Sequence, residues 1–199
     1  MMTVSSAILI LLTHVGADKA AKPAPWNVDK AHSSVGFVVK HLGLSNVRGS
    51  FGEFDAKIMA DPVTGKVTDV EATVQVKSVN TGIQKRDDHL KGDDFFSVEK
   101  FPIMKFKTKT VKVEGDHVVA TADITLRDVT KTVTFTGEYL GTQKVNFGDG
   151  NQLRAGYSLK GEINRKDFGL LFAGVAEGVS VVSDKVIIEL EMQISRKLS

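Results

Sequence analysis

The segment from Arg86 to His89 contains the residue types that a general acid–base catalyst uses. A histidine can accept a proton near neutral pH, and a neighbouring carboxylate can orient its imidazole ring. The segment is predicted to be helical, and successive helical residues point about 100° apart, so Asp88 and His89 diverge. No obvious nucleophile lies in a matching segment. We therefore expect these residues to cap the helix and tie its connection to the fold, with an enzyme that uses His89 and nearby carboxylates as the alternative.

The histidines are scattered along the chain and do not form a metal-binding pattern. His32, His41, His89 and His117 show neither H-x-H nor H-E-x-x-H spacing, whereas a metal site needs ligands that converge. The chain contains no cysteine, which excludes disulfides, thiol catalysis, iron–sulfur clusters and cysteine-ligated zinc. We expect neither a metal nor a cofactor.

Three cations are candidates for holding an anionic group: Arg86, Arg165 and Lys166. An arginine matches phosphate oxygens with two parallel hydrogen bonds, so Arg165 or Lys166 could meet a head group such as pyrophosphate. The neighbouring Asp167 could instead form a purely structural ion pair. Both interpretations stay open.

The composition is that of a folded domain with a balanced charge. The 199 residues are 42% hydrophobic and 25% charged, and 26 basic against 24 acidic residues give a net charge of +2. A single domain of this size can bury about 70% of the surface of its unfolded chain. No basic stripe stands out, so we do not expect nucleic acid as a partner.

From Trp26 onward, apolar and polar residues alternate with the period of a β-strand. Residues 70–76 are a clear example, with valines and an alanine on one face and Glu, Thr and Gln on the other. Turn residues separate the strands, as at Asp61–Lys66 and Glu114–His117. The apolar parity changes within Lys107–Thr110, which predicts a β-bulge there, and a similar change suggests a second irregularity at Gly52.

These strands, about eight in number, are nearly all one-sided, which indicates antiparallel pairing with one face in water. Only Gln84–Lys91 is predicted to be helical, with Asp93–Asp94 as its cap. One short helix cannot cover the apolar face of such a sheet. Closure removes both sheet edges, so we expect an all-β, eight-stranded antiparallel barrel with one short helix in a long connection.

The interior of such a barrel can be filled by side chains or can hold one small ligand. Many of the inward residues are small and leave room, but a dry, filled barrel that acts only through its surface stays an alternative. Two long connections, residues 78–101 and 164–184, carry large apolar residues that could plug the barrel or line its mouth. Trp26 is expected to plug one end. The residues expected to contact an apolar ligand are Phe37, Val39, Phe54, Ala72, Val74, Val76, Leu90, Phe95, Phe96, Phe106, Ile124, Phe135, Tyr157, Phe168, Leu170 and Phe172.

The first 25 residues differ from the rest. Residues 1–17 carry no charged side chain and contain a short apolar run, which predicts a signal peptide cut after Ala17, although it lacks the usual basic residue. The alternatives are a buried first strand or a misassigned start. Residues 18–25 are expected to be a flexible N-terminus, and residues 26–199 the barrel domain.

Several blocks resemble the YceI-like family. Residues 26–37 resemble its opening W-x-x-D-x-x-H-S-x-x-x-F pattern. Further blocks similar to the family are Ser78–Gly82, Arg86–Leu90, Asp93–Phe96, Phe101–Pro102, Leu126–Val133, Ile163–Gly169 and Val182–Val186. Together they cover roughly residues 26–194 in the family's block order.

The resemblance implies a secreted or periplasmic protein with a lipocalin-like barrel, usually a homodimer, that binds a polyisoprenoid or another long-chain amphiphile. It implies a carrier, a store or a sensor of such a lipid, with no transmembrane anchor.

Overall fold

The structure is a computed structural model that describes residues 21–148, 150–176 and 178–198. The predicted signal peptide, residues 1–17, and residues 18–20 of the predicted flexible segment lie outside the described residues. The first strand begins at Ala24, two residues before the predicted start of the domain.

The described residues form thirteen strands, one α-helix and three short 3₁₀ helices. The strands are β1 (Ala24–Val28), β2 (Ser34–His41), β3 (Ser45–Phe51), β4 (Phe54–Ala60), β5 (Val67–Gln75), β6 (Val79–Asn80), β7 (Ile103–Glu114), β8 (His117–Leu126), β9 (Val129–Asn146), β10 (Asn151–Asn164), β11 (Val175–Ala176), β12 (Val179–Ser180) and β13 (Val182–Lys197). The helices are α1 (Gln84–Lys91), η1 (Lys30–His32), η2 (Val76–Ser78) and η3 (Arg165–Phe168).

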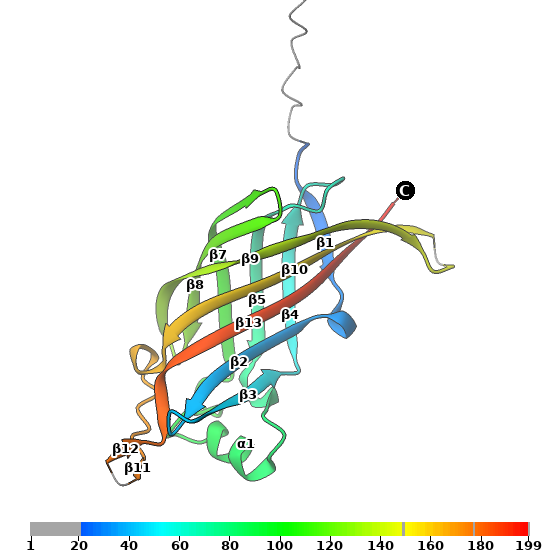
Figure 1. The fold of residues 1–199 in the computed structure, drawn as a ribbon. Coiled ribbons are helices and arrows are strands. Elements are labelled where there is room, and N and C mark those ends of the chain that lie inside the picture. Colours follow the sequence, from blue (N-terminus) through cyan, green and yellow to red (C-terminus); the bar gives the residue numbers. More distant parts are fainter. Residues whose placement is uncertain (1–20, 149, 177, 199) are drawn as a thin grey trace, which may run out of the picture.

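The main sheet closes into an eight-stranded antiparallel barrel, as predicted (Figure 1). Neighbouring strands pair in the order β1, β4, β5, β7, β8, β9, β10 and β13, and β13 pairs back with β1. β2 continues β1 along β13, while β3 and β6 continue β4 and β5. We call each of the eight positions around the barrel wall a stave. Three staves consist of two strands in series, and the breaks between these strands fall at η1, at Gly52–Glu53 and at η2.

Both predicted irregularities are confirmed. The register between β7 and β8 shifts between Thr108 and Thr110, where the apolar parity of the sequence changes. The second irregularity at Gly52 is the break between β3 and β4. At each place one extra step of the chain returns apolar side chains to the inside.

Helix α1 has the predicted bounds, but the predicted cap is wrong. The helix ends at Lys91, and Gly92 caps it, since the amide of Gly92 donates to the carbonyl of His89. Asp93 instead accepts a hydrogen bond from the Ser97 hydroxyl, and Asp94 pairs with His89. No helix in the described part of the chain is long and apolar enough to span a membrane.

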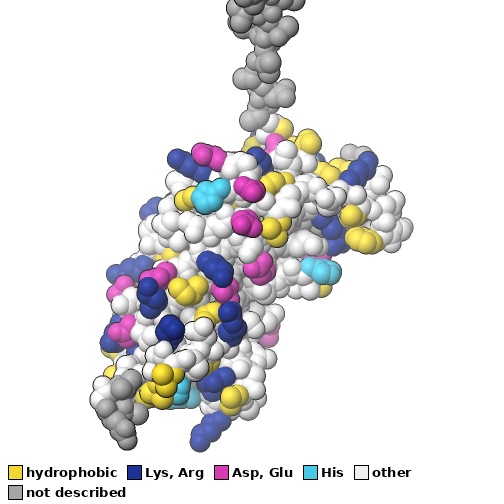
Figure 2. Space-filling model, in the orientation of Figure 1, with side chains coloured by type: hydrophobic (Ala, Val, Ile, Leu, Met, Phe, Trp, Pro, Cys, Tyr) yellow, Lys and Arg dark blue, Asp and Glu magenta, His cyan; other side chains and the backbone are white. Residues whose placement is uncertain are grey.

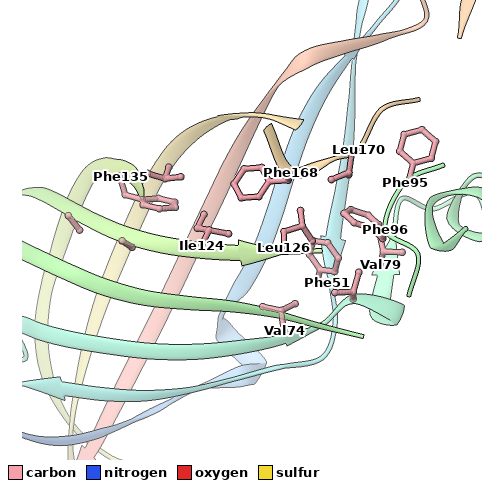
Figure 3. Packing of buried hydrophobic residues seen from close by; sticks show 14 residues of the cluster. Phe51, Val74, Val79, Phe95, Phe96, Ile124, Leu126, Phe135, Phe168 and Leu170 are labelled. Atoms are coloured by element: carbon pink, nitrogen blue, oxygen red, sulfur yellow. The ribbon is translucent and has the colours of Figure 1, made fainter. Parts of the chain in front are cut away.

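The buried residues form two clusters, one toward each end of the barrel. The larger lies where α1 and η3 cover the barrel, and we call this the α1 end. Figure 3 shows Phe95, Phe96 and Val79 of this cluster on the side toward the helix. The smaller surrounds Trp26, which is 3% exposed and packs among Ile58 and Val118. At this Trp26 end the tryptophan plugs the barrel, as predicted.

Candidate ligand-binding cavity

A cavity of about 230 Å³ lies inside the barrel and reaches from one buried cluster to the other. A space of about 10–15 Å³ holds one water molecule, and well-packed interiors contain few larger voids. This cavity is an order of magnitude larger. The interior of the barrel is therefore hollow rather than filled.

The wall of the cavity is almost entirely apolar. Its side chains come from alternate positions of the staves, because successive residues of a strand point to opposite faces. Of its four polar residues, Thr108, Tyr157 and Arg165 bond to the protein through their side chains, and Lys105 is exposed. The hydroxyl of Thr108 lies 2.9 Å from Asp69 Oδ1 and accepts from the amide of Val70 at 2.8 Å.

Tyr157 is the polar lining residue closest to the Trp26 end. Its hydroxyl donates to the carbonyl of Gly65 at 2.6 Å and accepts from the amide of Val67 at 3.0 Å. Burial raises the pKa of this phenol, so the group stays protonated and uncharged. The side chain thus places no charge in the cavity.

Most of the residues expected to contact a ligand line this cavity. Those that do are Phe37, Val39, Phe54, Ala72, Val74, Leu90, Phe95, Phe96, Phe106, Ile124, Phe135, Tyr157 and Leu170. Three do not line it: Val76 and Phe168 are fully buried in the cluster at the α1 end, and Phe172 stacks on Phe95 with ring centroids 4.9 Å apart. Ligand contact stays a prediction for the whole set.

The lining also contains residues that the sequence analysis did not single out. Among them are Ile58, Val118, Leu159, Ile188, Leu190 and Met192. The same alternation placed all of them on inward faces, so the signal was present. Which inward residues meet the cavity rather than another side chain depends on how closely the staves approach one another.

Arg165 lines the cavity at the α1 end but is bonded on every side chain nitrogen. It is 3% exposed, and it donates to the carbonyls of Ser183 at 3.1 Å and Leu170 at 2.5 Å. Its ion-pair partner is Asp184, at 3.0 Å, and not the expected Asp167. The turn at η3 directs Asp167 away, whereas β13 brings Asp184 alongside.

The two other candidate cations also have protein partners. Lys166 pairs with Asp184 at 2.8 Å, and these neighbours hold the pKa of Asp184 below its usual value, Lys166 most strongly. Arg86 donates to the hydroxyl and the carbonyl of Thr81, at 2.7 and 2.9 Å. A head-group role for these three cations stays a prediction, and it would require such bonds to break.

His89 lies outside the cavity lining. Its Nε2 is 3.1 Å from Asp94 Oδ2, and its ring meets the edges of Phe95 and Phe172. Asp88 turns to Gln84, as the helical spacing predicted. The described residues contain no group of three histidine, aspartate or glutamate side chains placed to hold a metal.

The pattern of sequence blocks and the closed barrel fit one family, and a family model decides the assignment. Residues 26–194 match the model of the YceI-like domain. The chain belongs to the YceI-like family. Relatives in the family include a UPF0312 protein of Staphylococcus aureus, 38% identical over 163 residues, which are 80% of this chain and 90% of the relative. Protein YceI of Salmonella paratyphi B is 35% identical over 153 residues, 76% of this chain and 78% of that protein.

Solved structures share the same architecture. The YCEI protein of Campylobacter jejuni is 34% identical, with a TM-score of 0.68 over 85% of this chain and 96% of that one. A polyisoprenoid-binding domain from Saccharophagus degradans is 15% identical, with a TM-score of 0.58 over 85% of this chain and 97% of that domain. The second likeness shows the fold alone.

In this YceI-like barrel the α1 end is closed by two connections that one side chain joins. Arg127 lies in the two-residue turn between β8 and β9, where both residues have positive φ. Its Nη1 donates to the carbonyl of Phe95 at 2.8 Å and to that of Gly169 at 2.7 Å. The guanidinium thereby holds the α1 connection and the η3 connection together, beside the stacked rings of Phe95 and Phe172.

The Trp26 end is closed by the turn between β4 and β5. Gly65 of this turn has a φ of +69°, and a β-carbon there would lie 3.2 Å from the Trp26 ring. Tyr139 and Tyr157 donate to carbonyls of the turn, and Arg196 donates to that of Pro62 at 3.0 Å. Both ends of the cavity are therefore covered by bonded segments.

Proposed function

We propose that this protein binds a long-chain isoprenoid or a similar amphiphilic lipid in the lumen of its barrel and serves in its transport, storage or sensing. The cavity carries the proposal. It is hollow and almost entirely apolar, and the buried polar side chains of its lining, Thr108, Tyr157 and Arg165, bond to the protein itself. Such a wall offers burial to a hydrocarbon chain and few partners to a polar substrate.

Apolar burial alone provides enough free energy for this role. Each buried CH₂ group contributes about 0.8 kcal/mol, and micromolar binding needs about 8 kcal/mol. Two or three isoprene units, of five carbons each, are therefore sufficient before the costs of ordering the chain. The relationship of fold to a domain described as polyisoprenoid-binding supports the same class of ligand.

We further propose that the protein is exported to the periplasm or beyond and acts as a homodimer, with neither nucleic acid nor a cofactor as partner. The uncharged segment of residues 1–17 supports export. On the face shown in Figure 2, cations and anions are interspersed, which does not favour nucleic acid. The mass of the exported protein tests cleavage after Ala17.

Organic extraction of the purified protein, followed by mass spectrometry, tests the proposed function. We expect a long-chain lipid in stoichiometric amount, or uptake of a prenyl compound by the extracted protein. Recovery of no lipid and no uptake afterwards would favour a barrel that acts only through its surface. The His89→Ala variant separates binding from catalysis, since a binding protein keeps its affinity and an enzyme that uses this histidine loses turnover.

A further inference from the structure

The wall of the barrel contains a seam in which two neighbouring staves do not pair. β1 pairs with β4 at residues 24–26 and 58–60, and β2 pairs with β3 at residues 35–41 and 45–51. Between these ladders, no backbone pair joins residues 27–34 to residues 52–57, all of which the structure describes. We call this stretch the seam.

Residues of the opening motif, within residues 26–37, form one side of the seam. The carboxylate of Asp29 accepts hydrogen bonds from the side chains of Arg154, at 2.6 Å, and Gln193, at 3.0 Å. The backbone amide of Asp29 donates to the backbone carbonyl of Gln193 at 2.8 Å. The same carboxylate lies 3.0 Å from Nδ1 of His32. These bonds hold η1 against β10 and β13, and so away from β4.

The other side of the seam, at Gly52 and Glu53, is bonded to the strands that lie away from β1. The amide of Gly52 donates to the carbonyl of Ser78 at 3.2 Å, and the carbonyl of Glu53 accepts from the amide of Gln75 at 2.8 Å. Both bonds draw the β3–β4 break toward β5 and η2. Among the described residues one ion pair crosses the seam, that of Lys30 and Asp55 at 3.4 Å, whose side chains are 56% and 72% exposed. Such an exposed ion pair contributes little stability.

A groove lies on the outer surface along this seam. Its lining residues are Lys30, Gly52, Glu53, Asp55, Thr73 and Gln75, together with Phe54. Phe54 also lines the lumen. One residue, Phe54, thus lies between the apolar cavity inside the barrel and the polar groove outside it.

Resting on the proposed function, we propose that the seam is a lateral portal through which the lipid chain enters and leaves the lumen, with its polar end held in the groove. The two ends of the barrel are covered by bonded segments, at Arg127 and at Tyr157. The seam has no ladder to break. A chain can pass there by displacement of Phe54 and of one exposed ion pair.

The groove fits an uncharged polar end. Lys30 pairs with Asp55, and Glu53 adds a second carboxylate, so the charged side chains of the groove sum to −1. Thr73 and Gln75 add a hydroxyl and an amide, which can donate and accept hydrogen bonds. An alcohol or amide end can bond here, whereas an anionic end is repelled.

A bulky label at the groove tests the portal. The chain has no cysteine, so a Thr73→Cys variant can be labelled at that site alone after it has folded. Thr136→Cys is the matched control, since Thr136 is also exposed on an outward strand face and lies on β9. Uptake of all-trans-retinol, an isoprenoid alcohol, is followed by its fluorescence in stopped flow.

We expect the labelled Thr73→Cys protein to take up retinol at least about tenfold more slowly, a barrier increase of about 1.4 kcal/mol. The labelled and unlabelled Thr136→Cys proteins keep the rate of the unmodified protein, and the labelled Thr73→Cys protein is compared with its own unlabelled form. Equal rates in all labelled proteins would overturn the portal, as would faster uptake by Arg127→Met, which loosens the α1 end. Failure of every protein to bind retinol would instead contradict the proposed function.

Retinol and retinoic acid test the polar end, because they share a chain and differ in charge. We expect retinol to bind more tightly than retinoic acid, and the Glu53→Gln variant to reduce that difference. Tighter binding of retinoic acid that is lost in Lys166→Ala would place the polar end at the α1 end and overturn the assignment of the groove.

Discussion

Ala72 and Phe106 face each other across β5 and β7, and both line the cavity. Positions of this kind decide how much room a ligand has, because an inward side chain either fills the lumen or leaves it free. Small residues such as Ala72, Ala120 and Val74 therefore act through the volume that they leave open. Their effect on function should exceed their effect on stability.

Replacement of Ala72 by Trp tests this view. The indole would occupy the lumen, so we expect affinity for retinol to fall at least about tenfold, while the free energy of unfolding changes by no more than about 1–3 kcal/mol. Glu71→Trp is the matched control, since Glu71 is the exposed neighbour on the opposite face of the same strand. Unchanged affinity in a folded Ala72→Trp protein would mean that the ligand binds elsewhere.

Asp29 shows how one carboxylate fixes the backbone of a broken stave. Burial raises the pKa of this carboxyl, but hydrogen bonds and charges from His32 and Arg154 outweigh it and leave the pKa lowered. Loss of the charge in Asp29→Asn should lower the free energy of unfolding by about 1–3 kcal/mol at neutral pH.

The pH dependence of this difference follows from the direction of the shift. Because the pKa is lower in the folded state than the unfolded value of about 3.9, the stabilisation is complete above that value. It disappears as the pH falls through the folded pKa. Urea unfolding of both proteins between pH 7 and pH 2 measures it, and a difference that persists unchanged at pH 2 would contradict the role of the charge.

At the scale of the elements, adjacent strands depend on close approach at particular positions. Gly161 of β10 lies opposite Phe135 of β9, and a β-carbon at residue 161 would lie 2.7 Å from the phenylalanine ring. Phe135 is 1% exposed and also lines the cavity. The inward ring of Phe135 therefore packs directly against the backbone of Gly161.

Gly161→Ala should lower the free energy of unfolding by about 1–3 kcal/mol, because the added methyl group overlaps the Phe135 ring and must displace it. Gly36→Ala is the control, since a β-carbon there meets its nearest atoms at 3.5 Å, an ordinary contact. Thermal or urea unfolding compares the two. Equal stability of both variants would contradict this expectation and would show that the Phe135 ring moves into the cavity at no cost in stability.

The two connections that close the α1 end depend on Arg127. Arg127→Met keeps the aliphatic part of the side chain and removes the bonds to Phe95 and Gly169. We expect faster amide hydrogen exchange in residues 92–101 and 169–174, with the strands of the barrel unchanged. Lys131→Met, an exposed position of the same hairpin, is the control. Exchange that rises equally throughout the barrel would contradict a local clamp.

For the whole molecule, the alternation of the sequence predicted the strands and the bulge at Thr108–Thr110. The closed barrel followed from these strands together with the single short helix, whose bounds were also predicted. The strands, the bulge and the helix bounds each depend on local periodicity or on turn residues. The alternation also predicted which side chains of each strand point into the barrel, and these include most of the residues that line the cavity.

Other features depend on contacts between distant segments, which local patterns do not encode. The partner of Arg165 is Asp184, 19 residues away, and Asp167 was expected only because it is near in sequence. The seam likewise arises because Asp29 bonds to Arg154 and Gln193, two strands that meet it only in the folded barrel. The hollow interior depends on the spacing of all the staves.

Energy transfer from Trp26 to retinol tests the central claim most directly. Trp26 is the single tryptophan of the chain and lies buried at one end of the lumen. A chain bound in the lumen should quench its emission, with saturation at one retinol per protein and reversal by a longer prenol. A folded protein whose Trp26 emission does not respond to retinol in a saturable way would contradict a lipid-binding lumen.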